Sequence, residues 1–463
     1  MSNTVHSTTA QPPVAAADVT DGQMINKFDP RSAAATLSPA DQALLARRRA
    51  TLGDIYPLFY DKPLHVVRGS GARLFDAEGL EYLDAYNNVP TVGHANPRVA
   101  KAVFDQLSLM NTHTRYLQDG VVSFAERFLA TYPAHLDRVI FSNSGSEAND
   151  LAITIAQWRT ANQGVIVTNM AYHGTTNLLA GASPENGPSM PLSAYVRTVE
   201  APDTFLYGED AGRVFADSVR DAIADLARHG MGTAALLLDT IMSTDGIFPG
   251  PNGMLNEAFD AVHAAGGLII ADEVQPGMGR TGEHMWGFQR HTDNVDMVTC
   301  GKPLAGGLPI GTLVLSQALS DGYAEGHRYF NTFGGNPASI AAANAVLDEI
   351  EDRDLMTSAR ETGEYLMKRI ADVSATSAIV GDVRGVGLFI GVEMTASASH
   401  PAGALARNMI NGLRDARVLI SAVGTTGQVL KVRPPLVFTT ADADEFVRAY
   451  EIVLTTVEEG ALL

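Results

Sequence analysis

The sequence predicts an α/β fold, with a large domain built on a mainly parallel sheet flanked by helices and a smaller α/β domain beside it. At 463 residues the chain exceeds the usual size of one compact core, so two domains are expected. The middle of the chain alternates short apolar runs with amphipathic helical patterns, which is typical of parallel α/β sheets. After Asn336 and Pro337 the pattern changes to helices followed by a glycine-rich strand, which indicates the second domain.

The apolar runs of the middle region are predicted to be the strands of the large sheet, at 138–141, 164–168, 234–238, 268–271, 297–300 and 311–315. Helices are expected between them, over 214–227 and where Ala148, Leu151, Ile155 and Trp158 recur at steps of three and four. Strands that are apolar on both faces need cover on both faces, which favours a parallel sheet between helices. Ligands of such sheets bind at the carboxyl ends of the strands, so the active site is expected there.

The smaller domain is predicted from the last third of the chain, completed by the segment 64–84. Its helices are expected at 338–350, 355–373, 405–416 and 441–457, and its strands at 385–392 and 429–433. The predicted organisation is an N-terminal tail or arm (1–38), the N-terminal part of the small domain (39–90), the large domain (91–330) and the C-terminal part of the small domain (331–463).

Charge and cysteine content exclude several classes of protein. The chain has 33 basic and 52 acidic residues, a net charge of -19, which argues against nucleic acid or an anionic membrane as a partner. The basic run Arg47–Arg49 is predicted to be a solvated helix face. One cysteine, Cys300, permits neither an intrachain disulfide nor a cysteine-based zinc site, and no metal is expected. With no export signal or membrane-spanning run in the sequence, a cytoplasmic location is expected.

Lys302, one of six lysines, has an unusual setting. It follows the apolar run 297–301 and precedes a segment that contains Pro303, Gly306 and Gly307. A lysine at the carboxyl end of a buried strand can have its pKa lowered by desolvation, which suits Schiff-base chemistry. The alternative is a structural lysine whose amine reaches out to solvent at the strand end.

A small-residue turn, Ser142 to Glu147, lies between a predicted strand and a helix that is expected to start near Glu147. Backbone amides at the start of a helix can hold a phosphate, and hydroxyls add further donors. A plain helix cap by Ser144 or Ser146 is the alternative. The turn is not a Walker loop, because it lacks the terminal Gly-Lys-Ser/Thr.

Two more strand ends carry polar groups. The apolar run 268–271 leads directly into Asp272 and Glu273, and a carboxylate there needs a cationic partner such as a protonated pyridine or magnesium. Tyr172 and His173 follow the strand at 164–168, and Tyr172 is either a stacking platform or core packing. A phosphate cradle, an aromatic platform, a buried acid and a strand-end lysine are together the parts of a pyridoxal phosphate site.

These motifs resemble the class III aminotransferases of the fold-type I pyridoxal-phosphate (PLP) enzymes. The resemblance runs from about Leu64 to the C-terminus and rests on five pieces in order: Asn143–Asn149, Tyr172–Gly174, Asp272–Gln275 with Gly277 and Gly279–Gly282, Gly301–Lys302, and Thr332–Pro337. Each piece is weak alone, and their order and spacing make the match specific. The resemblance implies a PLP enzyme and a homodimer with shared active sites, or a dimer of such dimers.

The resemblance also implies residue roles. Lys302 and Asp272 would be catalytic, the lysine as the Schiff-base and proton-transfer residue and the aspartate as the partner of the pyridinium nitrogen. Gly145 and Ser146 would hold the phosphate, and Thr332 would reach the phosphate of the neighbouring subunit. Tyr172 and Val274 would pack on the two ring faces, with Gln275 near the ring oxygen. The full implied cofactor set is Ser144, Gly145, Ser146, Tyr172, His173, Asp239, Asp272, Val274, Gln275, Lys302 and Thr332.

Within the class, the segments 82–89, 111–117, 381–391 and 429–435 resemble the branch that contains ethanolamine-phosphate phospholyase and alanine–glyoxylate aminotransferase 2. The chain departs from the wider family at two positions. Asp239 stands where many members have a glutamate that helps to govern a mobile substrate-binding arginine. Lys431 stands three residues before the Pro-Pro pair, where members that bind 2-oxoglutarate often have an arginine. The candidate substrate residues are Tyr60, Asn88, Arg115, Lys431 and Arg433.

The expected function is therefore PLP-dependent transamination. An amino group would move from a primary amine or amino acid to a keto acid or aldehyde through a ping-pong aldimine/pyridoxamine cycle. One alternative is a phospholyase that eliminates phosphate and ammonia from a phosphorylated amino alcohol. Another is a catalytically silent cofactor-binding or regulatory protein. A DNA-binding role would need an added basic module that the sequence does not contain.

Overall fold

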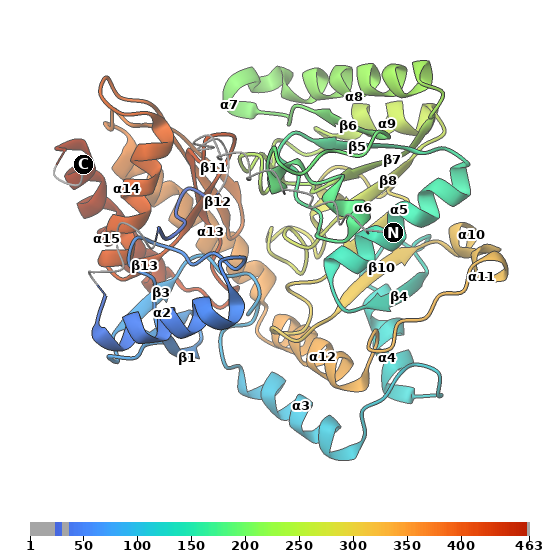
Figure 1. Cartoon of the computed structure of the whole chain (residues 1–463), viewed down its shortest axis with the longest axis horizontal. Helices are drawn as coiled ribbons and strands as arrows, with labels where there is room; N and C mark the ends of the chain where they lie inside the picture. Colours follow the sequence, from blue (N-terminus) through green and yellow to red (C-terminus); the bar gives the residue numbers. More distant parts are fainter. Residues whose placement is uncertain (1–23, 30–36, 461–463) are drawn as a thin grey trace, which may run out of the picture.

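The computed structural model describes residues 24–29 and 37–460, so most of the predicted tail at 1–38 lies outside the described residues. The fold is α/β, as predicted (Figure 1). The division into segments at 38, 90 and 330 stays a prediction. No helix among the described residues is long and apolar enough to cross a membrane.

Within the described residues, seven strands form the large sheet in the order β4-β10-β9-β8-β7-β5-β6. They are β4 (Arg138–Ser142), β5 (Gly164–Thr168), β6 (Val196–Val199), β7 (Thr233–Leu238), β8 (Leu268–Asp272), β9 (Met297–Cys300) and β10 (Gly311–Leu315). The neighbouring strands β9, β8, β7, β5 and β6 run parallel, whereas β10 is antiparallel to both β4 and β9. The mainly parallel sheet is thus confirmed. The sequence analysis missed β6, an edge strand whose apolar ends enclose Arg197 and Thr198.

Alternate side chains of each strand enter different cores on the two faces of this sheet. Ala235 and Leu237 pack with Leu151 and Ile155 of α5 (Gly145–Thr160). Leu236 and Leu238 belong to the core on the opposite face, which is covered by α8 (Ala211–Arg228) and α9 (Asn256–Ala264) (Figure 1). Shorter helices lie in the connections: α6 (Asn177–Ala180), η2 (Pro184–Asn186), α7 (Thr204–Tyr207), η3 (Gly208–Asp210), η4 (Gly287–Arg290), α10 (Gln317–Ser320) and α11 (Tyr323–Gly326).

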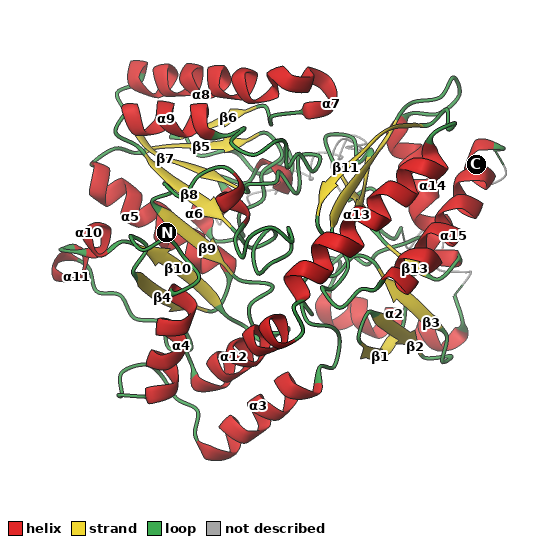
Figure 2. Ribbon diagram, turned by 180° about the vertical axis from the view of Figure 1, so that it is seen from behind, coloured by secondary structure: helices red, strands yellow, loops and turns green. Residues whose placement is uncertain are grey.

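The smaller domain holds two further sheets in the described part of the chain (Figure 2). One is β1-β2-β3-β13 and the other is β11-β12-β15-β14. The strands are β1 (Val66–Ser70), β2 (Arg73–Asp76), β3 (Glu81–Asp84), β11 (Val380–Val386), β12 (Phe389–Met394), β13 (Val418–Leu419), β14 (Ser421–Val423) and β15 (Val429–Val432). Their helices are α2 (Pro39–Leu52), α13 (Leu355–Ser374), α14 (Ala402–Asp415) and α15 (Thr440–Glu458). The parallel pairing of β3 with β13 joins the segment 64–84 to the C-terminal part.

The glycine-rich run 385–392 was predicted as one strand, and this prediction is wrong. The structure divides it into the ends of β11 and β12, which pair antiparallel. Gly387 makes the tight turn with φ of 52°, and a Cβ there would lie 2.4 Å from the carbonyl oxygen of Arg280. A glycine is therefore required by both the backbone conformation and the close approach of the large domain.

Three helices lie beside the large sheet: α3 (Pro97–Leu109), α4 (Asp119–Leu129) and α12 (Pro337–Asp352). The helix α12 packs on both α3 and α4, as Figure 1 shows in the lower part of the molecule. In the smaller domain, every residue of α2 keeps some solvent exposure, so Arg47–Arg49 form a solvated helix face as predicted.

Candidate active site

A cavity of about 270 Å³ lies where strands of the large sheet end, as the parallel-sheet rule predicts. All of the predicted cofactor residues except Thr332 line it. The lining residues are Val89, Asn143, Ser144, Gly145, Ser146, Tyr172, His173, Gly174, Asp239, Asp272, Val274, Gln275, Gly301, Lys302, Gly307, Leu308, Pro309 and Ile310. The residues that line the cavity therefore come from segments that are far apart in the sequence.

The small-residue turn both caps α5 and opens onto the cavity. Ser144 accepts a hydrogen bond from the amide of Glu147 at 3.2 Å, and Glu147 accepts one from the amide of Asn143 at 2.7 Å. The helix begins at Gly145, two residues earlier than predicted, because Ser144 takes the cap position. A Cβ at Gly145 would lie 2.7 Å from Val274, so glycine keeps this end of the cavity open. The amides of the first helical turn can therefore receive an anion.

Asp272, at the end of β8, is a buried carboxylate with three donors around it. Its Oδ2 accepts hydrogen bonds from Asn149 at 2.8 Å and from His173 Nδ1 at 2.7 Å. Its Oδ1 accepts one from the amide of Val274 at 3.1 Å. His173 Nε2 is buried and has no hydrogen-bond partner among the described residues. These donors fix the orientation of the carboxylate, which lines the cavity. A cation or an N–H donor in the cavity can therefore bind to it.

Asn149 is a functional residue that the sequence analysis did not select. Its amide also donates to the carbonyl of His173 at 2.9 Å, and its oxygen accepts from Thr299 Oγ1. It therefore fixes Asp272 and His173 with respect to β9. A signal was present, because Asn149 lies four residues after Gly145 and so faces the same side of the helix.

Lys302 follows β9 and lines the cavity, and its side chain is reached by solvent through the cavity in the single chain. Its Nζ lies 5.8 Å from the centre of the Tyr172 ring. Desolvation lowers its pKa, the nearby Arg433 lowers it further, and the carboxylates of Asp272 and Asp239 oppose the shift. This is the setting that the sequence predicted for an amine that reacts as a nucleophile and base.

Glu185 lies outside the lining of the cavity but close enough for its carboxyl to be affected by the charges of two site lysines. Burial raises the pKa of its carboxyl, against the opposing charges of Lys431 and Lys302. It lies in η2, within a turn-rich segment, and its amide donates to the carbonyl of Ala171 beside Tyr172. Nothing in that segment of the sequence distinguishes Glu185 from an exposed loop residue.

Two cations from the smaller domain meet one residue of the cavity wall. Lys431, on β15, donates to Gln275 Oε1 at 3.0 Å and to the carbonyl of Ser243 at 2.8 Å. Arg433 donates to the same Gln275 oxygen and to the carbonyl of Tyr86. Both side chains are buried, and burial lowers the pKa of each; repulsion from Arg433 lowers the pKa of Lys431 further, whereas Tyr86, Asp84 and Asp239 oppose the shift of Arg433. The site is therefore rich in positive charge on the side of the smaller domain.

The other predicted substrate residues, Tyr60, Asn88 and Arg115, and the predicted cofactor residue Thr332 do not line this cavity. Tyr60 is buried in the smaller domain and donates its hydroxyl to the carbonyl of Ile420 at 3.0 Å. Arg115 lies exposed over the Phe330 ring. Asn88 donates to the carbonyl of Val274 at 3.3 Å, so it contacts the wall from behind. Thr332 is exposed next to Asn331, whose amide donates to Glu147 at 2.9 Å.

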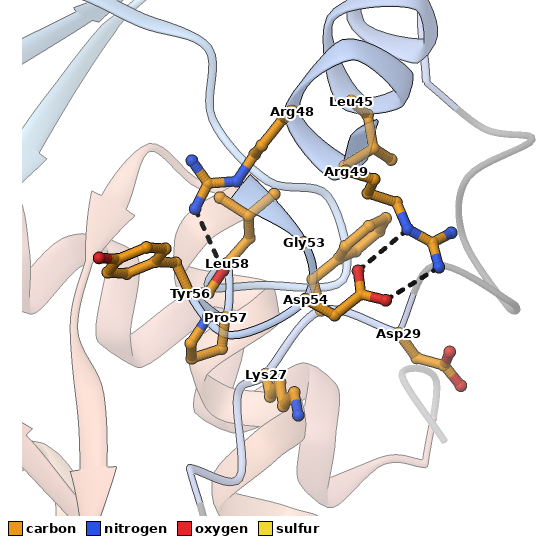
Figure 3. A pocket seen from close by; sticks show the side chains of 11 residues that line it. Lys27, Asp29, Leu45, Arg48, Arg49, Gly53, Asp54, Tyr56, Pro57 and Leu58 are labelled. Carbon is orange, nitrogen blue, oxygen red and sulfur yellow. Dashed lines mark hydrogen bonds and ion pairs between the residues drawn. The ribbon is translucent and has the colours of Figure 1, made fainter. Parts of the chain in front are cut away.

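A second hollow, of about 460 Å³, lies beside α2 and also contains charged groups (Figure 3). There Arg49 pairs with Asp54 at 3.0 Å, and Arg48 donates to the carbonyl of Tyr56 at 3.1 Å. Both partners of the ion pair are well exposed. Arg48, Arg49 and Asp54 therefore bond to one another or to backbone at the surface.

Residues 58–454 match the family model for class III aminotransferases. A Drosophila melanogaster protein named alanine–glyoxylate aminotransferase 2-like is 36% identical over 433 residues, which cover 90% of this chain and 87% of that protein. A Caenorhabditis elegans protein named ethanolamine-phosphate phospho-lyase homolog 1 is 33% identical over 449 residues, covering 92% and 96% of the two chains.

Among solved structures, a phospholyase from Arthrobacter in complex with phosphoethanolamine superposes with a TM-score of 0.86. It shares 45% sequence identity, and the match covers 89% of this chain and 99% of that one. The resemblance found in the sequence motifs therefore extends over nearly the whole described chain.

Proposed function

The chain belongs to the class III aminotransferase family, and from this we propose that it is a PLP-dependent aminotransferase. It would move an amino group from a primary amine or amino acid to a keto acid or aldehyde in a ping-pong cycle. The family match over residues 58–454 supports the reaction type. The single observation that carries the proposal is the lining of one cavity by Lys302, Asp272 and the amides at the start of α5. These groups come from three separate elements of the sheet.

The cavity fits pyridoxal 5'-phosphate, the cofactor of this family. The open helix start at Gly145 and Ser146 suits the phosphate, and the absence of a Cβ at Gly145 provides room beside Val274. The buried Asp272 suits a protonated ring nitrogen, and Tyr172 supplies an aromatic face. Lys302, with its lowered pKa, is the amine that would hold the aldehyde.

When bound, the cofactor supplies an aldehyde that joins amines and a ring that withdraws electrons from the substrate carbon. The residues of the chain do the rest. Lys302 would take the proton from the substrate carbon and return it, and its lowered pKa favours the neutral amine that can accept a proton. Asp272, held by Asn149 and His173, keeps negative charge at the back of the cavity throughout.

Lys431 and Arg433 are proposed to receive the anionic group of a substrate. Each donates to Gln275, so an anion entering from the cavity would find two positive charges next to its wall. Arginine offers a planar pair of donors that matches a carboxylate or phosphate, whereas lysine acts as a point charge. Substituting R433K should therefore raise KM for an anionic substrate by about tenfold, the loss of one charge-assisted hydrogen bond.

Phosphate elimination is a second candidate, favoured by the same pair of buried cations. A phosphorylated amino alcohol would lose a proton to Lys302 and then its phosphate by cleavage of the carbon–oxygen bond, and hydrolysis of the enamine would release ammonia. The phosphate carries about two negative charges, for which Lys431 and Arg433 offer two positive ones. The 45% identity with the Arthrobacter phospholyase supports this candidate.

A panel of amine donors and acceptors separates the two candidates. Purified holoenzyme is incubated with alanine, glutamate, simple amines or ethanolamine phosphate, with and without pyruvate or 2-oxoglutarate. Transamination requires an acceptor and yields a new amino acid without phosphate. Release of phosphate and ammonia with no acceptor present would replace the aminotransferase proposal by the phospholyase one. Loss of both activities in K302A is expected under either.

We further propose a homodimer with shared active sites. Thr332 and Phe333 lie exposed next to the phosphate end of the cavity, where Asn331 bonds to Glu147. Large apolar side chains are exposed on α3, in the segment that follows it and around 330–333: Phe104, Leu107, Leu109, Leu117, Phe330 and Phe333. Such a patch is typical of an interface. Light scattering should give a dimer, and mixing K302A subunits with T332A subunits should restore activity above that of either alone.

The proposed location is the cytoplasm. Cys300 is buried and free, so the fold gains nothing from an oxidising compartment. Fractionation of cells that express the chain should recover it with cytoplasmic markers.

A further inference from the structure

The segment 239–248, which leaves the end of β7, is buried and has a strained backbone. Met242 and Ile247 have positive φ angles of 54° and 63°. Neither side chain has any solvent exposure. A positive φ is a rare conformation for a β-branched residue such as Ile247. Such strain persists only where surrounding contacts determine the backbone, and it gathers at functional sites.

Arg384, on β11 of the smaller domain, supplies those contacts. Its Nη2 donates to the carbonyl of Gly246 at 2.6 Å, and its Nε donates to the carbonyl of Ile247 at 2.8 Å. The same guanidinium pairs with Glu393 on β12 at 2.6 Å and with Asp382 at 3.0 Å. Arg384 and Glu393 are both buried. A planar fork of donors is needed to reach two carbonyls and two carboxylates at once.

The other end of the same segment belongs to the active site. The amide of Ile241 and the hydroxyl of Ser243 both donate to the carboxylate of Asp239, which lines the cavity. The carbonyl of Ser243 accepts the hydrogen bond from Lys431. The strained turn joins both ends, because the amides of Gly246 and Ile247 donate to the carbonyl of Met242.

We propose that Arg384 is a positioning residue for the active site. By holding the carbonyls of Gly246 and Ile247, it fixes the Asp239 carboxylate and the Ser243 carbonyl that receives Lys431. The inference rests on the proposed function in so far as Asp239 and Lys431 serve the reaction. The connection of Arg384 to the segment is independent of which substrate is used.

The test is R384K in the holoenzyme, with R369K as the matched control. Lysine keeps the positive charge beside Glu393 but cannot reach both carbonyls. Arg369 also bonds to a carboxylate, Asp444 at 2.8 Å, in the same domain but between α13 and α15. Hydrogen–deuterium exchange of peptides that cover 239–248 should become about tenfold faster in R384K, because local opening costs less. Exchange in R369K should match the wild type.

Kinetics supply the second measurement. A small displacement of positioned groups can cost about 100-fold, so kcat/KM for the best donor should fall by about that factor in R384K. The loss should appear mainly in KM, and the visible absorption of the bound cofactor should remain, because Lys302 and Asp272 stand on other strands. R369K should keep wild-type values.

Unchanged exchange of 239–248 in R384K would overturn the inference, and so would a loss of kcat/KM equal to that of R369K. If R384K does not fold, E393Q replaces it, since glutamine keeps the size of the side chain and removes only the charge that holds Arg384. Faster exchange at 239–248 in E393Q supports the inference, and wild-type exchange overturns it. Failure of the aminotransferase proposal would show in the donor panel and leave the exchange result unaffected.

Discussion

Two hollows of the molecule, one beside α2 and one at the large sheet, both contain charged residues and differ in how those residues are paired. The hollow beside α2 has Arg48, Arg49 and Asp54, and its charges are exposed and bonded to one another or to backbone (Figure 3). In the cavity of the large sheet, the buried Asp272 accepts hydrogen bonds from Asn149 and His173. Lys302 has Arg433 near it, which lowers its pKa, and the carboxylates of Asp272 and Asp239, which oppose that shift.

The reactivity of a charged group depends on how it is paired and on how far it is shielded from water. In water, an exposed ion pair is worth little, because the solvent already stabilises each partner. Around the cavity, desolvation lowers the pKa of Lys302 and raises that of Glu185, and shifts of this kind gather at functional sites. The larger hollow is thus expected to be inert and the smaller one to be the active site.

The largest effect is expected from K302A. Removing the amine removes both the attachment point of the cofactor and the proton carrier, so the rate should fall on the order of 10⁴-fold. The measurement is the steady-state rate together with the visible absorption of the purified protein. K101A is the control, because Lys101 forms an exposed i,i+4 pair with Asp105. A K302A protein with normal absorption and turnover would show that Lys302 is neither the attachment point of the cofactor nor the proton carrier.

The next effect is expected from D272N. The amide keeps the size of the carboxyl group but removes the negative charge that faces the cavity, and His173 and Asn149 lose a charged acceptor. Breaking a buried, hydrogen-bonded charge pair costs about 3 to 4 kcal/mol, so kcat/KM should fall roughly 100- to 1000-fold. Activity at saturating cofactor measures this, and D54N in the other hollow serves as the control. Equal losses in D272N and D54N would contradict the distinction between the hollows.

The parts of the site that could be predicted from the sequence are those with an unusual local pattern. Lys302 and Asp272 each directly follow an apolar strand, so local pattern and the parallel-sheet rule bring them together. Asn149 meets His173, Asp272 and Thr299 only in the folded chain, and its spacing from Gly145 was the one local signal for it. The roles of Tyr60, Arg115 and Thr332 stay predictions, since their positions relative to a substrate depend on a bound ligand or a second subunit.

In the fold, too, the elements with a clear local pattern were predicted and those without one were missed. The strands β5, β7, β8, β9 and β10 were predicted because they are apolar on both faces. The edge strand β6 was missed because Arg197 and Thr198 interrupt its apolar pattern. The run 385–392 was assigned to one strand because its composition is continuous. Only the close approach of the Arg280 carbonyl reveals why Gly387 turns there.

A third prediction concerns Asp245, which lies in the strained segment and accepts hydrogen bonds from Thr168 at 3.0 Å and from the amide of Met170 at 3.2 Å. Burial raises its pKa to about 6, with repulsion from Asp239 adding to the shift and His173 opposing it. Between about pH 4 and 6, the folded protein therefore keeps a proton that the unfolded chain has released. Its contribution to stability is full below about pH 4 and is lost as the pH rises to about 6.

The variant D245N tests that sign. The difference in unfolding free energy between wild type and D245N should shift against the wild type by roughly 3 kcal/mol from pH 4 to pH 6, and stay constant above pH 6. Urea unfolding of the two holoenzymes at four or five pH values measures it. A difference that is flat across this range, or that rises with pH, would show that Asp245 is ionised in the folded protein throughout. Such a result would place its pKa with those of ordinary surface carboxylates.

The smallest effect is expected in the hollow beside α2, where D54N removes the partner of Arg49. The two side chains are 48% and 69% exposed, so water replaces the lost interaction on both sides. An exposed pair of this kind contributes about 0 to 1 kcal/mol, and salt screens it further. Urea unfolding at low and high salt should therefore separate D54N from wild type by less than about 1 kcal/mol, and turnover should not change. A D54N variant that lost activity would make the second hollow part of the catalytic apparatus. The pairing of charges at the surface would then no longer distinguish an inert hollow from an active site in this protein.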